Sequence, residues 1–146
     1  MYEKAKALAT KAHEGQTRWD PNIPYITHPI ALAEQFTNDT YKTVAVLHDV
    51  VEDTDITLEF LATQFPQEVV DAVDAITKRK WEAYDEYILR CGKNPIAASV
   101  KIRDINYNVA DLPEDGKKIT RIRKERYALA LHILKNYSMY GRAPGY

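Results

Sequence analysis

Residues 47–55 read LHDVVEDTD and place one histidine and four carboxylates in nine positions, with no Lys or Arg among them. Apolar residues recur at helical spacing through the same region, which predicts a helix whose apolar arc packs on the core. If that helix is continuous, its polar residues share one arc roughly 140° wide beside the core. The polar residues of this arc are His48, Asp49, Glu52 and Asp53. The stretch therefore favours a helical fold with an acidic face close to its core.

The acidic character extends well beyond this stretch. Residues 43–77 contain eight carboxylates and no basic residue, and all 20 Lys and Arg lie on either side. Like charges one helical turn apart destabilise a helix, so something is expected to offset them. Two interpretations are open: a solvated acidic face, or a face balanced by a cation from elsewhere in the chain or by a metal ion. An imidazole beside carboxylates is a natural ligand set for a divalent metal.

The rest of the chain also follows helical periodicity, and no segment alternates with period two for long enough to predict a strand. Its 146 residues, 45% hydrophobic, fit one compact domain. Capping residues predict helix starts near Asn38, at Thr57 and at Asn94-Pro95, the last running to about residue 110. We expect an all-α bundle of about eight helices over residues 1–140, followed by a flexible tail at 141–146.

Composition narrows the class of protein. A net charge of −1 argues against a DNA-binding protein. No apolar run approaches the roughly 18 residues of a membrane span. The single cysteine, Cys91, cannot form an internal disulfide and suits a reducing cytosol. We expect a cytoplasmic protein without DNA or membrane partners, and the sequence does not predict its oligomeric state.

Two further residues are candidate metal ligands. His28 lies at the start of a predicted short helix in IPYITHPIALA, where the alternative is a core histidine or a helix cap. Asp104 lies within a mostly apolar helix, one turn from Lys101 and from Asn108. Aspartate lowers helix propensity in such a position, which indicates another purpose. For Asp104 the alternative is an ion pair with Lys101 or Arg103.

Six motifs in this order resemble the HD superfamily of metal-dependent phosphohydrolases. The resemblance is greatest to the hydrolase domain of the RelA/SpoT family and its stand-alone alarmone hydrolases, and it spans nearly the whole chain. The motifs are AHEGQTR (12–18), PYITHPI (24–30), LHDVVEDT (47–54), YDEYILR (84–90), NPIAASVKIRD with Asn108 (94–108) and RIRKERYALALHIL (121–134). The resemblance implies an all-helical HD domain.

The resemblance also implies four ligands for one divalent ion, which in this branch is usually manganese. These ligands are His28, His48, Asp49 and Asp104. Two imidazoles and two carboxylates suit Mn²⁺, Fe²⁺ or Zn²⁺ and leave positions open for water and phosphate. Glu52 and Asp53 match the acidic pair of the family and are the candidate catalytic residues, placed to orient or deprotonate the attacking water. The alternative role for either residue is to support His48.

Four residues are candidate substrate contacts. Arg18 matches the first residue of the family's Arg-Lys pair, which grips the nucleotide, but Trp19 stands where Lys is usual. Arg18 can stack on a base or bind a phosphate, whereas Trp19 can only stack or pack. Asn108 matches a family position near the sugar of the substrate, with capping of a local backbone group as its alternative. Lys101 is grouped with these residues as a further substrate-binding candidate.

The resemblance implies an enzyme that removes the 3′-pyrophosphate of guanosine 3′,5′-bis(diphosphate) (ppGpp) with an activated water, giving GDP and pyrophosphate. Two alternatives are open. One is an HD phosphohydrolase of another nucleotide or phosphorylated metabolite, which Trp19 favours. The other is a non-catalytic helical interaction module whose acidic helix contacts a basic partner. His13, at the end of the first predicted helix, is interpreted as structural.

Overall fold

The computed structural model describes residues 1–136, and over this range the chain forms nine α-helices. The prediction of an all-α fold is confirmed for these residues, in which the β-type pairing is limited to one isolated bridge between Thr17 and Pro24. Contacts divide the chain into two units, of which the first is residues 1–77 and the second begins at residue 78. The expected domain extent of 1–140 stays a prediction, and the expected tail at 141–146 lies outside the described residues.

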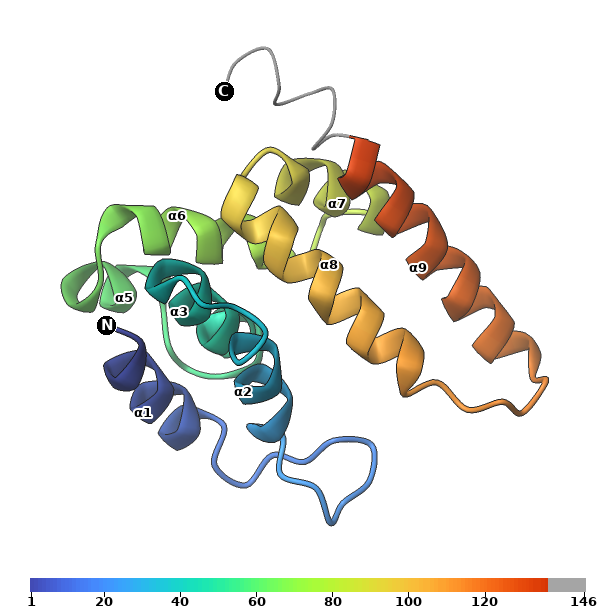
Figure 1. Cartoon of the computed structure of the whole chain (residues 1–146), viewed down its shortest axis with the longest axis horizontal. Coiled ribbons are helices and arrows are strands. Elements are labelled where there is room, and N and C mark those ends of the chain that lie inside the picture. Colours follow the sequence, from blue (N-terminus) through green and yellow to red (C-terminus); the bar gives the residue numbers. More distant parts are fainter. Residues whose placement is uncertain (137–146) are drawn as a thin grey trace. The chain divides into compact units, whose positions relative to one another are not determined.

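The first unit is built around α3. Its helices are α1 (Tyr2–Ala12), α2 (Thr27–Ala33), α3 (Asp39–Leu47), α4 (Val50–Asp53), α5 (Leu58–Gln64) and α6 (Gln67–Ile76). Helix α3 packs against α1, α2 and α6 (Figure 1). Because neighbours cover it on several sides, every residue from Thr43 to Leu47 is fully buried. The predicted caps are present: the Asn38 side chain accepts from the Tyr41 amide, and the Thr57 hydroxyl accepts from the Phe60 amide.

The expectation of one continuous helix through residues 47–55 is wrong. Helix α3 ends at Leu47, and the short helix α4 begins at Val50. Between them the backbone of Asp49 takes φ −110° and ψ 0°, outside helical geometry. Aspartate competes with helical backbone bonding and favours such helix starts. The polar residues therefore do not share one helical arc. Instead, the turn buries His48 and leaves Glu52 and Asp53 exposed at the next helix.

In the described part of the second unit, three helices all pack on one another: α7 (Tyr84–Gly92), α8 (Pro95–Ala110) and α9 (Lys118–Asn136) (Figure 1). Helix α8 has the predicted bounds because the Asn94 side chain caps two amides of its first turn and Pro95 follows as the first helical residue. Just before α7, the buried Glu82 carboxylate accepts two bonds from the Arg90 guanidinium, at 2.7 and 2.9 Å.

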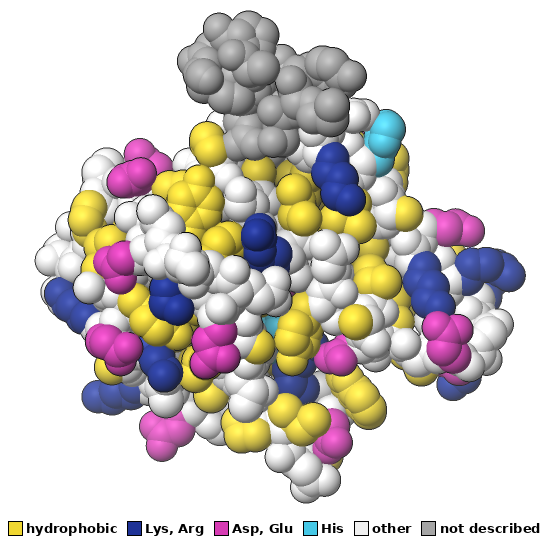
Figure 2. Space-filling model, viewed as in Figure 1, with side chains coloured by type: hydrophobic (Ala, Val, Ile, Leu, Met, Phe, Trp, Pro, Cys, Tyr) yellow, Lys and Arg dark blue, Asp and Glu magenta, His cyan; other side chains and the backbone are white. Residues whose placement is uncertain are grey.

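The charges on the described surface are mixed. Figure 2 shows Lys or Arg side chains interspersed with Asp or Glu over the described part of the face drawn. None of the helices within residues 1–136 combines the length and the apolar character that crossing a bilayer requires.

Candidate functional site

His48 lies in the turn between α3 and α4, where its ring is 2% exposed. Its Nδ1 lies 2.7 Å from the Ala45 carbonyl oxygen. A carbonyl can only accept, so Nδ1 carries the proton and donates it. The other ring nitrogen, Nε2, then presents its lone pair 3.0 Å from the Asp49 Oδ2. Two electron-rich atoms at this separation call for a proton or a metal ion beside them, and a His anchored through a backbone carbonyl is the usual arrangement of a metal ligand.

Helix α2 places His28 beside this pair. His28 lies in the first turn of α2, is 1% exposed, and packs its ring edge-on to His48 with 5.4 Å between ring centroids. The structure therefore brings three of the predicted ligands, His28, His48 and Asp49, together within the first unit.

Tyr25 belongs to this site, although it was not predicted. Its hydroxyl donates to Oδ2 of Asp49, the same oxygen that faces His48. The hydrogen bond accounts for the orientation of the Asp49 carboxylate, which makes no cap bond to α4. Tyr25 lies in the same PYITHPI motif as His28, and that proximity was the signal available in the sequence.

Glu52 and Asp53 lie on α4, one turn beyond Asp49. Partial desolvation of Asp53, together with the carboxylates of Asp49 and Glu52, raises the pKa of Asp53 to about 6. His13 and His48 act in the opposite direction. The three carboxylates thus form an acidic turn next to two buried imidazoles, a donor set that suits a divalent cation.

The loop before α2 carries two predicted substrate contacts. It folds back on itself, with the Arg18 amide donating to the Ile23 carbonyl at 2.9 Å. The Arg18 guanidinium lies 5.9 Å from the ring centroid of Tyr25, so it stacks on the residue that holds Asp49. Trp19 is 79% exposed. The structure thus places Arg18 beside the site, whereas Trp19 presents its ring to solvent.

In the second unit, the other predicted residues form a cluster on α8. The Lys101 ammonium lies 2.9 Å from Asp104 Oδ2, and the Asn108 amide donates to Asp104 Oδ1 at 3.3 Å. Asp104 is 4% exposed. Desolvation lowers the pKa of Lys101, but Asp104 and two tyrosines outweigh it and raise this pKa well above its ordinary value. The ion pair with Lys101, one of the alternatives for Asp104, is therefore present. Asn108 donates to the side chain of Asp104.

The chain is similar to several known proteins. A family model described as "HD domain" matches residues 5–84. The guanosine-3′,5′-bis(diphosphate) 3′-pyrophosphohydrolase of Vibrio cholerae is 32% identical over 87% of this chain and 21% of its own length. The bifunctional (p)ppGpp synthase/hydrolase SpoT of Escherichia coli is 30% identical over 90% of this chain and 21% of its own length. The chain therefore spans about a fifth of the length of these curated relatives.

A solved structure is similar as well. It is described as a metazoan orthologue of SpoT that hydrolyses ppGpp, and it superposes with a TM-score of 0.76 at 27% identity, covering 91% of this chain and 84% of the other. The HD family match and three buried ligand-type side chains, His28, His48 and Asp104, indicate a divalent metal ion. Because the family model matches more than half of its residues, the chain belongs to the HD domain family.

Proposed function

We propose that this chain is a metal-dependent phosphohydrolase that removes the 3′-pyrophosphate of ppGpp, giving GDP and pyrophosphate. One observation carries the proposal: His48 donates from Nδ1 to a backbone carbonyl, so its Nε2 faces Asp49 beside the buried ring of His28. The name of the Vibrio cholerae relative and the description of the solved neighbour, both given for ppGpp hydrolysis, support the choice of substrate.

The proposed metal ligands are those implied by the family: His28, His48 and Asp49 from the first unit and Asp104 from the second. Two buried imidazoles and two carboxylates suit a first-row divalent ion, and we propose Mn²⁺. When bound, such an ion supplies Lewis-acid activation of water and of a phosphate oxygen. The chain's contribution is to fix the donors, since Ala45 sets the tautomer of His48 and Tyr25 orients the carboxylate of Asp49.

Glu52 and Asp53 are the proposed catalytic residues. Both are exposed on α4, within one turn of Asp49, where a carboxylate can accept a proton from the attacking water or hold that water in line. In their alternative role, these two residues support His48 and do not contact the substrate. In the first role Glu52 or Asp53 acts on the attacking water itself, whereas in the second role it acts through His48.

Arg18 and Trp19 are proposed to bind the nucleotide. The guanidinium of Arg18 can bind two phosphate oxygens at once, and its stacking on Tyr25 limits the conformations it must give up. The exposed ring of Trp19 offers a flat surface on which a base can stack. Lys101 and Asn108 are proposed as further substrate contacts, sharing their donors between Asp104 and the substrate.

A second candidate function is favoured by one residue. Trp19 stands where the family's charged pair has Lys, which removes a positive charge from the expected phosphate contacts. An HD phosphohydrolase acting on a less highly charged nucleotide or phosphorylated metabolite would need fewer such charges. The third possibility, a non-catalytic interaction module, predicts no bound metal.

We also propose a cytoplasmic location and no DNA partner. The chain has a single cysteine, Cys91, which is buried, and burial raises the pKa of its thiol to about 12, so it is an inert core residue suited to a reducing compartment. A net charge of −1 does not supply the basic surface that DNA binding requires.

The proposal is tested by analysing the products after manganese-loaded protein is incubated with ppGpp. Release of GDP and pyrophosphate by the wild type, and not by Asp49→Asn, supports ppGpp hydrolysis at this site. If manganese binds but ppGpp is not consumed, the substrate assignment is wrong, and a panel of other nucleotides becomes the next assay. If no manganese binds, the enzymatic proposal itself fails.

A further inference from the structure

The turn that follows α1 holds a buried histidine that the proposed mechanism does not use. His13, 2% exposed, caps the end of α1. Gly15 then takes φ +84°, a backbone conformation that favours glycine, and the Gln16 amide donates to the His13 carbonyl at 3.0 Å. This tight turn returns the Gln16 side chain toward the acidic turn on α4.

The two ends of the Gln16 amide have different partners. Its Nε2 donates to the backbone carbonyl of Asp53 at 2.9 Å, and its Oε1 lies 2.9 Å from Nδ1 of His13. Because a carbonyl can only accept, the Gln16 nitrogen must face Asp53 and its oxygen must face His13. Nδ1 of His13 therefore carries the proton and donates it. His13 fixes Gln16, and Gln16 fixes the backbone of a proposed catalytic residue.

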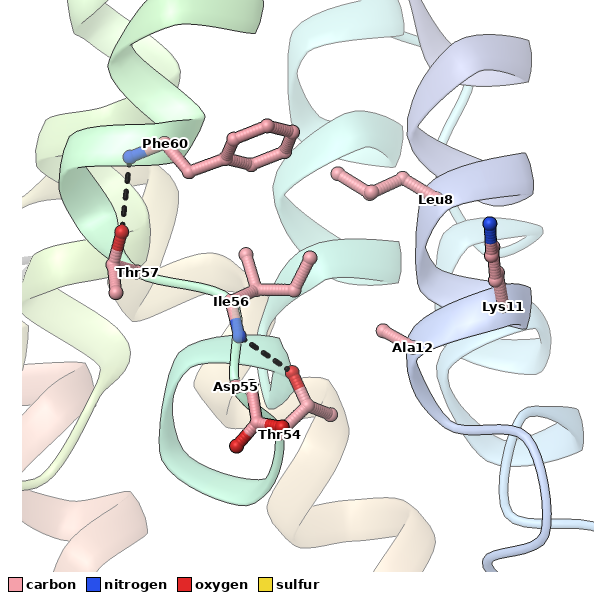
Figure 3. A pocket seen from close by; sticks show the side chains of 8 residues that line it. All are labelled: Leu8, Lys11, Ala12, Thr54, Asp55, Ile56, Thr57 and Phe60. Carbon is pink, nitrogen blue, oxygen red and sulfur yellow. Dashed lines mark hydrogen bonds between the residues drawn. The ribbon is translucent and has the colours of Figure 1, made fainter.

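Beside this link, α1 faces the segment that follows α4. A pocket of about 510 Å³ lies there, lined by Leu8 and Ala12 of α1, by residues 54–57 and by Phe60 of α5. Figure 3 shows the side chains of Leu8 and Phe60 pointing toward each other, with Ile56 between them. The hydrogen bond from Gln16 to Asp53 is a polar connection between the end of α1 and the end of α4.

His13 also contacts the other side of the site. Its ring lies 4.9 Å, centroid to centroid, from the ring of Tyr25, whose hydroxyl donates to Asp49. The His13 imidazole thus contacts two residues of the site. Gln16 bonds to the backbone of Asp53, and Tyr25 bonds to the carboxylate of Asp49.

We propose that Gln16, held by His13, is a positioning residue that fixes the acidic turn of α4 for hydrolysis. The inference rests on the proposed function, because it assigns Gln16 a role through Glu52 and Asp53. If the turn at residues 13–16 has a purely structural role, substitution of Gln16 should lower overall stability only. A positioning role predicts a local change at α4 and a fall in kcat.

The first test is Gln16→Met, which keeps the length of the side chain and removes both bonds. Hydrogen–deuterium exchange is measured at the amides of Asp53 and Thr54, which bond to the carbonyls of Asp49 and Val50 at 3.0 and 3.1 Å. We expect these amides to exchange about tenfold faster, while amides of α3 are unchanged. With ppGpp, kcat should fall about 10- to 100-fold with KM within about twofold, because misplacement of reacting groups affects the chemical step.

Gln67→Met is the matched control. The Gln67 side chain also donates one hydrogen bond, to Asp71 at 2.8 Å, but on the exposed face of α6. This variant should leave both the exchange at α4 and kcat at wild-type values.

Substitution of His13 tests the second half of the link. In His13→Asn the side-chain amide can donate in place of Nδ1, so kcat should recover to within about threefold of the wild type. His13→Leu has no donor, and its kcat should match that of Gln16→Met. Equal losses in the Asn and Leu variants would contradict the hydrogen-bonded link.

The exchange measurement separates this inference from the proposed function. Unchanged exchange at Asp53 and Thr54 in Gln16→Met overturns the inference, whatever the enzyme does with ppGpp. Faster exchange with an unchanged kcat would show that Gln16 holds the turn but does not position it for hydrolysis, and this result also overturns the inference. If the wild type does not hydrolyse ppGpp, the proposed function fails, and the exchange data alone then judge whether Gln16 holds the turn.

Discussion

The two units surround a carboxylate close to the core in different ways. In the second unit, Asp104 has a cation of the chain beside it, with the Lys101 ammonium 2.9 Å away. In the first unit, Asp49 faces a histidine nitrogen at 3.0 Å, accepts from a tyrosine hydroxyl, and lies in a segment without Lys or Arg from residue 43 to 77. On α8 a lysine of the same helix therefore lies beside the carboxylate, whereas at Asp49 the neighbours are a histidine nitrogen and a tyrosine hydroxyl, and we propose a metal ion beside them.

The largest effect is expected at His48, a proposed ligand of the metal ion in the first unit. His48→Gln removes the nitrogen that faces Asp49 and should lower ppGpp turnover by about 10³-fold, because activation of water and phosphate is lost. Steady-state kinetics at saturating Mn²⁺ measures this change. Turnover within tenfold of the wild type would show that His48 does not belong to the machinery.

The next effect sharpens the comparison from the side of the second unit. Lys101→Met leaves the buried Asp104 carboxylate without its ammonium and should lower the free energy of unfolding of the metal-free protein by about 3 kcal/mol. Urea unfolding measures it. If Asp104 is also a metal ligand, as proposed, added Mn²⁺ should recover part of the loss.

One result would count against the proposed ligand role of Asp104. A loss that Mn²⁺ does not reduce would remove Asp104 from the ligand set. The control is Lys124→Met, which breaks the exposed pair with Glu114 at 3.4 Å. This control should change the free energy of unfolding by less than about 1 kcal/mol, because exposed ion pairs contribute little.

A smaller, pH-dependent effect is expected at another ion pair of the second unit, that between Glu82 and Arg90. Glu82 accepts hydrogen bonds from the Arg90 side chain and from the Arg79 backbone amide, and both arginines are positively charged. These interactions outweigh desolvation and lower the pKa of Glu82 from 4.5 to about 2. A carboxyl group with a lowered folded-state pKa stabilises the fold above its unfolded pKa. That contribution should therefore be lost as the pH falls from about 4.5 to about 2.

Glu82→Gln checks this assignment. The variant should be less stable than the wild type at pH 7 by about 2 kcal/mol, less than the usual cost of breaking a fully buried pair because Arg90 keeps access to water. Its free energy of unfolding should also fall less steeply than that of the wild type between pH 4.5 and pH 2. Parallel pH profiles for the two proteins would show that Glu82 does not carry this dependence.

The comparison also explains which features could be predicted from the sequence. Helix α8 was predicted closely because Asn94 and Pro95 determine its start through local bonds. Lys101 was named as a partner of Asp104 because a spacing of three residues on a helix brings side chains together. Such features depend on neighbours in the sequence.

The remaining features depend on contacts between distant residues. The break at His48 and Asp49 falls within a stretch whose apolar spacing is helical. Tyr25, which donates to Asp49, lies 24 residues away in the sequence. The link from Gln16 to Asp53 spans 37 residues. No local pattern predicts hydrogen bonds of this kind, so the acidic residues could be identified from the sequence but their arrangement could not.

The measurement that tests the central claim most directly is a calorimetric titration of the metal-free protein with Mn²⁺, repeated with Asp49→Asn. The account predicts one ion per wild-type chain and at least about tenfold weaker binding in the variant, because the amide keeps the shape of Asp49 but removes its charge. Equal affinity in the two proteins, or no binding in either, would contradict the claim that the acidic turn of the first unit is built to hold a metal ion.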